Sequence, residues 1–430
     1  MKKIRPDITP IVNSYLCHSC GACYASCGHG SISFTESIGG YYFPIIDYDS
    51  CTRCGLCLDV CSGDHLGNTA VNKLTDDPFI GNIKMCKVGV STKKEIYENS
   101  QSGGVVTGLL SYLLDTRAIE VAVVSIMQEK VPPRGDVILA YNSKDLARSQ
   151  KSKYTPIPLL NILHKLNNVK GPIAIVGLAC HMQSLQNYCE VFKKIRKKEI
   201  IKIGLICDRV LTTTSIDFIS TMATKKSVKH LIFRDKGKAS YPGYPLVITT
   251  DNHRIKLDKK VRLRMKDYFT PARCRLCFDK MNVLSDIVCG DPHGMNTDNQ
   301  NNGETLLFVR TNKGKEIINN AETDNALKLR DANVDRAIIG QSIEKKRYDW
   351  SAYTLAWEAM GHTSPNYSFK PKLAKIENHK ARLVHALNLD RYETKSELIE
   401  DAKKFYYKDG VKRKIANYYL KLLKKCNVNK

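Results

Sequence analysis

The chain has 430 residues, of which 43% are hydrophobic and 26% are charged, which is ordinary for a globular protein of two or three domains. Its longest apolar runs, such as AVVSIM and IAIVGLAC, are far shorter than the roughly 20 residues of a membrane span, so we expect nothing to cross a bilayer. The formal net charge is +24, but residues 1–85 hold 6 Lys and Arg against 8 Asp and Glu, so the basic charge belongs to the later domains.

These basic residues are dispersed, and no nucleic-acid-binding motif accompanies them. We therefore expect no nucleic-acid partner, and a basic cleft for an anionic cofactor explains part of the charge. The start of the chain, MKKIRPDITP, has basic residues but no apolar stretch after them, so we expect no cleavable signal peptide. The 16 cysteines then indicate a reducing, cytoplasmic setting.

Half of the cysteines lie in two runs with the same CxxCxxCxxxC spacing. In bacterial two-cluster ferredoxins the last Cys of each run ligates the other cluster. This exchange predicts two 4Fe-4S sites, one from Cys17, Cys20, Cys23 and Cys61 and the other from Cys51, Cys54, Cys57 and Cys27.

Zinc and disulfides are the alternatives to this interpretation. Zinc prefers two separated CxxC pairs, which two runs of four thiols fit poorly, and disulfides would be crowded at this spacing. The proline that usually follows the fourth Cys is replaced by Gly28 and Ser62, which changes no ligand.

After residues 62–85, where the ferredoxin module should end, the sequence is of α/β type. Residues 99–127 predict a small-residue loop, a helix from about Gly104 to Asp115 and a buried strand from Val121 to Ile126. The loop of Ser102, Gly103 and Gly104 opens that helix, where backbone N–H groups and the helix dipole favour a phosphate or pyrophosphate. A plain turn is the alternative.

The same pattern recurs further along the chain. Residues 172–188 predict a strand, a turn with Cys180 and a helix, and IKIGLICDRV predicts a strand ending at Cys207. YPGYPLVITTDNHRIKL alternates like an antiparallel hairpin around Asp251 and Asn252. RCRLCFDK then supplies Cys274 and Cys277, and ETLLFVRTNKGKEII predicts a strand and a turn leading into a helix.

The order of these segments resembles one known family. The twin cluster motif is followed by SQSGGVVTGLL, SKYTPIP, IVGLAC, IGLIC, FRDK, CRLCFDKMNVLSDIVCGD and LLFVRTNKG. This order is similar to that of the coenzyme F-420 hydrogenase/dehydrogenase beta-subunit family, to which the plant hydroxymethyl-chlorophyll reductase is related. The resemblance spans roughly residues 10–345 and implies an FAD domain that exchanges electrons with iron–sulfur clusters and with a hydride carrier or organic substrate.

We therefore expect a protein of the α+β and α/β classes with three parts. These are a bacterial-type ferredoxin module at residues 1–85, a mixed α/β flavin domain at 86–345 and a basic helical extension at 346–430. The resemblance places FAD near Ser102, Gly103 and Gly104. Lys153 and Tyr154 match a family segment where Lys could pair with a cofactor phosphate, although a solvated Lys is the alternative.

Four more thiols in matched segments predict a third 4Fe-4S cluster between the ferredoxin module and the flavin. Cys180 and Cys207 follow buried strands, whose carboxyl ends should face a shared crevice. The other two are the CxxC pair, Cys274 and Cys277, where Arg273, Arg275 and Lys280 would offset the charge. Zinc or inert thiols are the alternatives. We interpret Cys86, Cys189, Cys289 and Cys426 as ordinary thiols.

Some residues depart from the family pattern near the expected substrate site. Ala179, Cys180 and His181 stand where Pro-Cys-Gln is usual, and Cys207, Asp208 and Arg209 stand where Cys-His-Gly is usual. His181 and His293 flank site loops and are weak candidates for proton transfer near the flavin, against a structural or surface role. Arg234 and Arg310 are weak candidates for holding an acidic ligand.

Two functions of different classes follow from the sequence. The first is an iron–sulfur flavin oxidoreductase, fed by a ferredoxin, that acts on deazaflavin coenzyme F-420 or on a bacterial small molecule, for instance in surface-polysaccharide synthesis. The second is an electron-transfer beta subunit of a hydrogenase or formate dehydrogenase with no substrate of its own. The fused ferredoxin module favours the first.

The C-terminal segment GVKRKIANYYLKLLKKC has apolar residues at helical spacing among Lys and Arg. A helix packed on its own domain is the simpler interpretation. Peripheral contact with an anionic membrane is the alternative.

Overall fold

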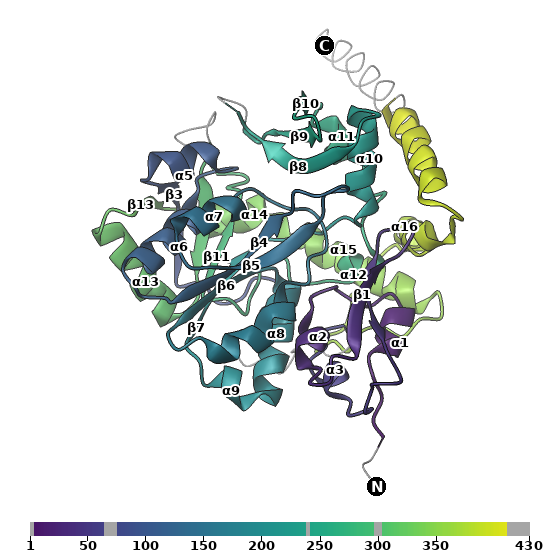
Figure 1. The fold of residues 1–430 in the computed structure, drawn as a ribbon, viewed down its shortest axis with the longest axis horizontal. Coiled ribbons are helices and arrows are strands. Elements are labelled where there is room, and N and C mark those ends of the chain that lie inside the picture. The colour runs from purple at the N-terminus through teal and green to yellow at the C-terminus, as the bar shows by residue number, and fades with distance from the viewer. Residues whose placement is uncertain (1–3, 64–74, 238–240, 296–302, 411–430) are drawn as a thin grey trace.

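The structure is a computed structural model that describes residues 4–63, 75–237, 241–295 and 303–410. Its centre is an eight-stranded sheet in the order β13-β3-β12-β11-β7-β6-β4-β5 (Figure 1). The parallel strands are β4 (Val121–Met127), β6 (Ile173–Gly177), β7 (Ile200–Leu205) and β11 (Ile287–Gly290). The strands whose neighbours are all antiparallel are β3 (Met85–Ser91), β5 (Gly135–Ala140), β12 (Thr305–Val309) and β13 (Leu327–Asp331).

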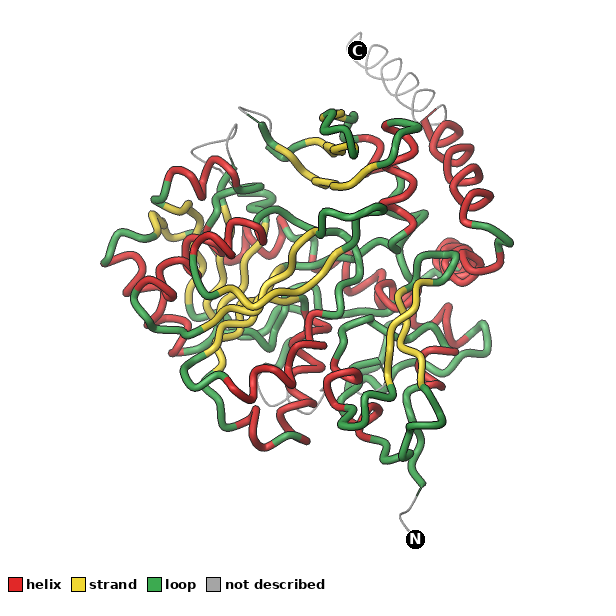
Figure 2. Tube along the Cα trace, viewed as in Figure 1, coloured by secondary structure: helices red, strands yellow, loops and turns green. Residues whose placement is uncertain are grey.

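Helices lie on both faces of this sheet, so the central strands are apolar on both sides (Figure 2). Val121 and Val123 of β4 pack in one cluster with η1 (Leu159–Asn168) and α8 (Ala179–Val191). Ala122 and Val124 of β4 point to the other face and pack in a second cluster with α6 (Val105–Asp115) and α13 (Asn312–Thr323). The shorter helices of this part are α5 (Lys94–Asn99), α7 (Ser143–Ser149), α9 (Lys193–Arg196) and α14 (Val334–Gly340).

A second, three-stranded sheet is inserted between β7 and β11 of the chain. Its strands are β8 (Val228–Asp235), β9 (Tyr244–Thr249) and β10 (Arg254–Lys256), and the associated helices are α10 (Thr214–Ala223), α11 (Lys260–Arg264) and α12 (Ala272–Arg275). The predicted hairpin is confirmed as β9 and β10, and Asn252 in its turn has a φ of 66°.

In its described residues, the ferredoxin module has three short helices and one hairpin. These are α1 (Thr9–Asn13), α2 (Ala22–Ser26), β1 (Ile32–Glu36), β2 (Tyr42–Ile46) and α3 (Leu56–Asp59). Helix α2 contacts both η1 and α8, so the module lies directly on the main domain.

The C-terminal part comprises α15 (Ile343–Glu358), α16 (Glu377–Asn388), η2 (Leu389–Arg391) and a helix over residues 395–410. It packs on the other parts: the Tyr41 hydroxyl donates to the Ala386 carbonyl at 2.7 Å, and the Tyr268 hydroxyl donates to Asp401 at 2.6 Å. The amphipathic C-terminal segment lies outside the described residues beyond its first glycine. No helix in the described ranges is long and apolar enough to cross a membrane.

Several predicted helices and strands agree closely with the structure. The boundaries expected between the three parts, after residues 85 and 345, fall inside a strand and a helix. The helix expected at residues 104–115 is α6, and the strand expected at 121–126 is β4. Strand β3 of the main sheet begins at Met85, and α15 runs across the boundary drawn at residue 345. The extension is therefore continuous with the main domain.

Candidate functional site

The first group of thiols gathers where the ferredoxin module meets α8. Burial raises the pKa of the Cys23 thiol, and the neighbouring Cys20, Cys17 and Cys61 raise it further. The backbone N–H of Ser19 lies 3.2 Å from the Cys17 sulfur. Cys61 of the second run thus lies beside the first run, which is the arrangement that the ferredoxin exchange predicts.

The second group lies nearer the surface. Cys54 is exposed, whereas Cys27, Cys51 and Cys57 are half-buried. Cys27 and Cys57 border one small apolar cluster, and burial is the main cause that raises the pKa of the Cys57 thiol to about 11. The module therefore has an inner and an outer group of four thiols.

The third group lies at the carboxyl ends of β6 and β7. Burial raises the pKa of the Cys180 thiol, and so do the nearby thiols of Cys207, Cys277, Cys20 and Cys274. The parallel strands β6 and β7 are direct neighbours, so the residues that follow them meet at one edge of the sheet. The structure brings these four predicted ligands together and places them next to the inner group.

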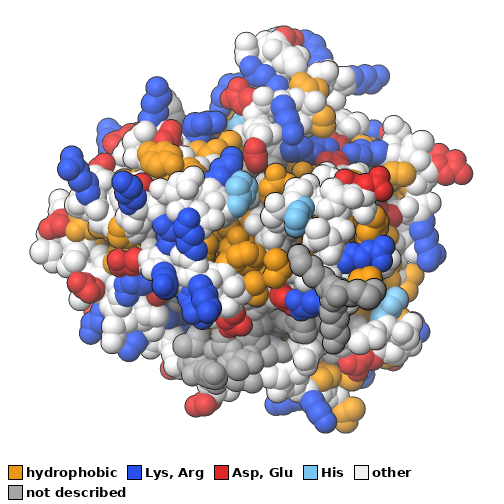
Figure 3. Space-filling model, turned by 60° about the horizontal axis from the view of Figure 1, so that its bottom comes forward, with side chains coloured by type: hydrophobic (Ala, Val, Ile, Leu, Met, Phe, Trp, Pro, Cys, Tyr) orange, Lys and Arg blue, Asp and Glu red, His pale blue; other side chains and the backbone are white. Residues whose placement is uncertain are grey.

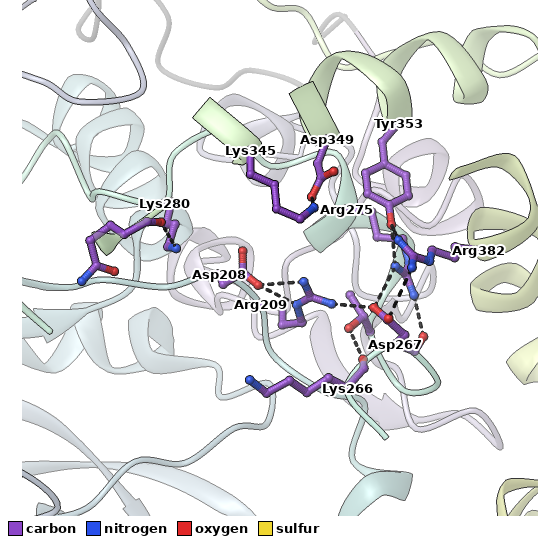
Figure 4. A network of polar contacts seen from close by, with 12 residues as sticks. Asp208, Arg209, Lys266, Asp267, Arg275, Lys280, Lys345, Asp349, Tyr353 and Arg382 are labelled. Atoms are coloured by element: carbon purple, nitrogen blue, oxygen red, sulfur yellow. Dashed lines mark hydrogen bonds and ion pairs between the residues drawn. The ribbon is translucent and has the colours of Figure 1, made fainter. Parts of the chain in front are cut away.

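Cations surround the third group. Burial raises the pKa of the Cys277 thiol, while Lys346 and Arg273 act in the opposite direction. Lys346 lies on α15, and no sequence motif marks it as a neighbour of the thiols. Arg275 donates to the Tyr353 hydroxyl and to the Asp267 carbonyl oxygen, so its predicted role beside the thiols stays a prediction (Figure 4).

No three His, Cys, Asp or Glu side chains in the described ranges are grouped as the ligands of one metal ion would be. A cluster of four irons spreads its thiolates over several metal atoms, whereas a zinc site draws four sulfurs to one ion.

A cavity of about 310 Å³ connects the predicted flavin loop with the third group of thiols. Its lining includes Ser102 and Gly104 at the start of α6, Lys153 and Tyr154, and Cys207 after β7. Burial lowers the pKa of Lys153 to about 7, and its amine donates to the carbonyl oxygens of Ser149 and Gln150.

Gly103 does not face this cavity. A Cβ at this position would lie 2.3 Å from the Gly89 carbonyl oxygen and 2.7 Å from the Thr305 nitrogen, and its N–H donates to the Thr305 hydroxyl at 3.1 Å. The glycine is required by close packing on the sheet. Its N–H is not free for a phosphate, which corrects the predicted role.

Of the two predicted histidines, His181 lines the cavity, but both of its ring nitrogens have backbone partners. The Nδ1 atom of His181 accepts from the Leu178 N–H at 3.1 Å, and Nε2 lies 3.2 Å from the Ile157 carbonyl oxygen. Burial lowers the pKa of His181 to about 4, so it is neutral and holds the start of α8. His293 is exposed, and the residues that line the cavity do not include it.

A basic wall completes the cavity. Arg234 pairs with Asp291 at 2.7 Å and donates to the Tyr154 hydroxyl at 3.1 Å, yet its Nη2 has no hydrogen-bond partner in the described part of the chain. The same holds for Nε of the buried Arg262. Lys266 also lines the cavity and extends away from the network of Figure 4. Such donors suit a negatively charged ligand.

The other predicted basic residue, Arg310, has a structural role. It donates to the carbonyl oxygens of Asn82 and Met281, both at 2.8 Å. On the face shown in Figure 3, Lys and Arg are scattered among acidic and apolar side chains and form no continuous stripe.

Comparisons with known proteins agree with this geometry. Residues 86–164 and 171–335 match the N-terminal and C-terminal models of "Coenzyme F420 hydrogenase/dehydrogenase, beta subunit". Together these two matches cover more than half of the chain. Residues 16–64 match a 4Fe-4S dicluster domain.

Among curated relatives, one subunit of the F(420)H(2) dehydrogenase of Methanosarcina mazei is 24% identical over 80% of this chain and 92% of its own length. The beta subunit of the coenzyme F420 hydrogenase of Methanosarcina barkeri is 24% identical over 58% of this chain and 83% of its length. The chain spans about half (54%) of the coenzyme F420-dependent sulfite reductase of Methanocaldococcus jannaschii, at 24% identity over 82% of this chain.

A chain in the structure of the F420-reducing [NiFe] hydrogenase complex from Methanosarcina barkeri has a similar fold. Its TM-score is 0.54 and its sequence identity is 20%, over 68% of this chain and 99% of that chain.

Proposed function

Because the chain belongs to the coenzyme F420 hydrogenase/dehydrogenase beta-subunit family, we propose that it is an iron–sulfur flavoprotein oxidoreductase. In this proposal the three groups of thiols hold three 4Fe-4S clusters, and the cavity holds FAD. Electrons pass between a ferredoxin or a partner subunit and an organic hydride acceptor or donor, which is deazaflavin or another small molecule.

The observation that carries the proposal is that Cys207 lines the same cavity as Ser102 and Gly104 at the start of α6. A cofactor whose pyrophosphate lies at the start of α6 would extend toward the third cluster. A flavin accepts single electrons from such a cluster and exchanges a hydride with a substrate.

The chain's own residues would position and charge-balance this cofactor. Arg234 and Arg262 each have a guanidinium nitrogen without a hydrogen-bond partner among the described residues, and these nitrogens would donate to the anionic groups of the cofactor. The negative charge of the cofactor would also offset the repulsion between the two arginines. Lys346 and Arg273 would offset the charge of the third cluster.

The test is metal and flavin analysis of the full-length protein after anaerobic reconstitution. We expect about twelve irons and one FAD per chain. The double variant Cys274→Ala with Cys277→Ala should lose about four irons, retain flavin and no longer reduce it through the ferredoxin module. An unchanged iron content, or the loss of one zinc, would eliminate the third cluster.

The runner-up function is an electron-transfer subunit without a substrate of its own. The names of the relatives favour it, because two of them are called subunits of F420-dependent enzymes. Purification of the untagged protein from its native cells distinguishes the two: an enzyme is recovered as a single species, whereas a subunit is recovered with a large partner.

A further inference from the structure

A chain of buried polar atoms links the inner thiols of the ferredoxin module to the third group. The Cys20 sulfur lies 3.1 Å from the Ser184 hydroxyl, which lies 2.7 Å from the Ser62 hydroxyl. Ser62 Oγ in turn lies 3.0 Å from Nδ1 of His18 and 3.4 Å from the Cys180 carbonyl oxygen. Two serines therefore bridge a predicted ligand of one cluster and a predicted ligand of another.

Both serines are fully buried, and their positions explain a departure from the ferredoxin pattern. Ser62 follows the last cysteine of the second run, where proline is usual, and proline could not supply this hydroxyl. Ser184 lies one turn after Cys180 on α8, so the same helix face carries the thiol and the hydroxyl.

Cluster binding determines which group donates in each of these hydrogen bonds. A free Cys20 thiol can donate to Ser184, which then donates to Ser62. Once Cys20 binds iron as a thiolate it has no proton and can only accept, so Ser184 must donate to the sulfur and accept from Ser62. His18 Nδ1 then donates to Ser62, and its other nitrogen has no partner in the described part of the chain.

Resting on the proposed clusters, we propose that the Ser184 hydroxyl donates to the Cys20 thiolate and raises the reduction potential of the inner cluster. Ser62 and His18 are positioning residues that hold this donor. Reduction adds negative charge to a cluster, and a hydrogen bond to a ligating sulfur stabilises that charge.

The outer group has backbone donors instead, because the N–H groups of Ile8 and Leu58 hydrogen-bond to the Cys57 sulfur. Within the described residues, no side chain donates to the sulfurs of Cys27, Cys51, Cys54 or Cys57. The Ser184 hydroxyl is therefore a side-chain donor found at the inner group and not at the outer group in the described part of the chain, and the inner group lies beside the third group. A simple structural role, in which the serines only satisfy each other, predicts no effect on any potential.

The experiment is an EPR-monitored redox titration of the full-length, reconstituted protein. In Ser184→Ala, the reduced-to-oxidised ratio of one cluster at a fixed potential should fall by roughly two- to tenfold, where tenfold corresponds to 59 mV for one electron. Ser184→Thr keeps the hydroxyl and should titrate like the wild type. Ser215→Ala, which removes a buried hydroxyl from α10, is the matched control and should change no potential.

Unchanged potentials in Ser184→Ala at full iron content would overturn the inference and leave the clusters in place. If this variant loses iron, Ser62→Ala decides, since it keeps the Ser184 hydroxyl but removes its support. A smaller downward shift in Ser62→Ala supports the inference, and no shift overturns it. Wild-type protein without iron at the inner site would instead contradict the proposed function.

Discussion

At the residue scale, Gly103 shows how a motif can be predicted for a reason that the structure does not support. The sequence predicts that the SGG loop binds a phosphate, but the α-carbon of Gly103 faces the backbone of β3 and β12. Gly104, which has a φ of 74° at the start of α6, is the glycine that borders the cavity.

We therefore expect Gly103→Ala to destabilise the fold. Its Cβ would lie 2.3 Å from the Gly89 oxygen, so two strands must shift, at a cost of about 1–3 kcal/mol in the free energy of unfolding. Anaerobic urea unfolding measures this cost. Gly28→Ala is the control, because no atom lies within 4 Å of the added Cβ. An equal effect of both variants would contradict the packing role.

Lys153 predicts a pH dependence of flavin binding. Burial lowers its pKa to about 7, so it is a cation at pH 6 and neutral at pH 9. If it faces a cofactor phosphate, the affinity for FAD should fall roughly tenfold between these values as a charge-assisted hydrogen bond is lost.

Fluorescence titration of FAD into the deflavinated protein at both pH values tests this prediction. Lys153→Met should bind weakly at both, without the pH step. Lys226→Met is the control, since Lys226 pairs with Asp251 at 2.6 Å and is not among the residues that line the cavity. A pH step that persists in Lys153→Met would assign it to another group.

At the element scale, α15 supplies a positive charge beside the third group of thiols that no sequence motif predicts. Lys346 is buried on this helix and lowers the pKa of the thiols beside it, whereas its neighbour Lys345 points to solvent and pairs with Asp349 (Figure 4). The helix begins after the end of the family match at residue 335.

Lys346→Met should therefore lower the reduction potential of the third cluster, because one nearby positive charge is removed from a site that becomes more negative on reduction. EPR redox titration of the reconstituted protein measures the shift. Lys345→Met changes the same charge one residue away and should leave the potential unchanged. Equal titrations for both variants would show that Lys346 does not tune the cluster.

At the scale of the whole molecule, one arginine joins three parts of the chain. Arg134 contacts Glu36 of the ferredoxin hairpin at 2.7 Å and Asp217 of α10 at 2.9 Å, while Lys395 of the C-terminal helix contacts Glu36 at 2.6 Å. Burial alone would raise the pKa of Glu36, but hydrogen bonds from Arg134 and Lys395 outweigh it and lower the pKa to about 2.

Arg134→Met should cost about 2–3 kcal/mol at pH 7, since it leaves two partly buried carboxylates with one cation. Because the pKa of Glu36 is lowered, the stabilisation that its ionised carboxylate gives the fold is present above an ordinary pKa of about 4.3 and is lost as the pH falls toward 2. The difference in the free energy of unfolding between the wild type and Arg134→Met should therefore narrow in acid. Urea unfolding at pH 7 and pH 3 measures this difference. The exposed pair Lys226–Asp251 offers the control, Lys226→Met, with an effect near zero.

The sequence by itself determined the grouping of the cysteines and several main elements of the fold, because thiols at fixed spacing and strands with apolar runs carry local signals. The twin runs predicted the exchange of Cys61 into the inner group, and the strands before Cys180 and Cys207 predicted their meeting, since parallel strands end at one edge. The periodic patterns likewise predicted α6, β4 and the β9–β10 hairpin within a residue or two.

Only the tertiary structure decided which of these residues face the cavity and what lies around the thiols. Gly103, His181 and Arg310 are held by groups far away in sequence, and no local pattern encodes such contacts. Ser184 lies 164 residues from Cys20, and Lys346 lies on a helix far beyond Cys277 in the sequence. Burial makes these contacts strong, and burial is a property of the packed molecule, because it depends on segments that meet only after the chain has folded.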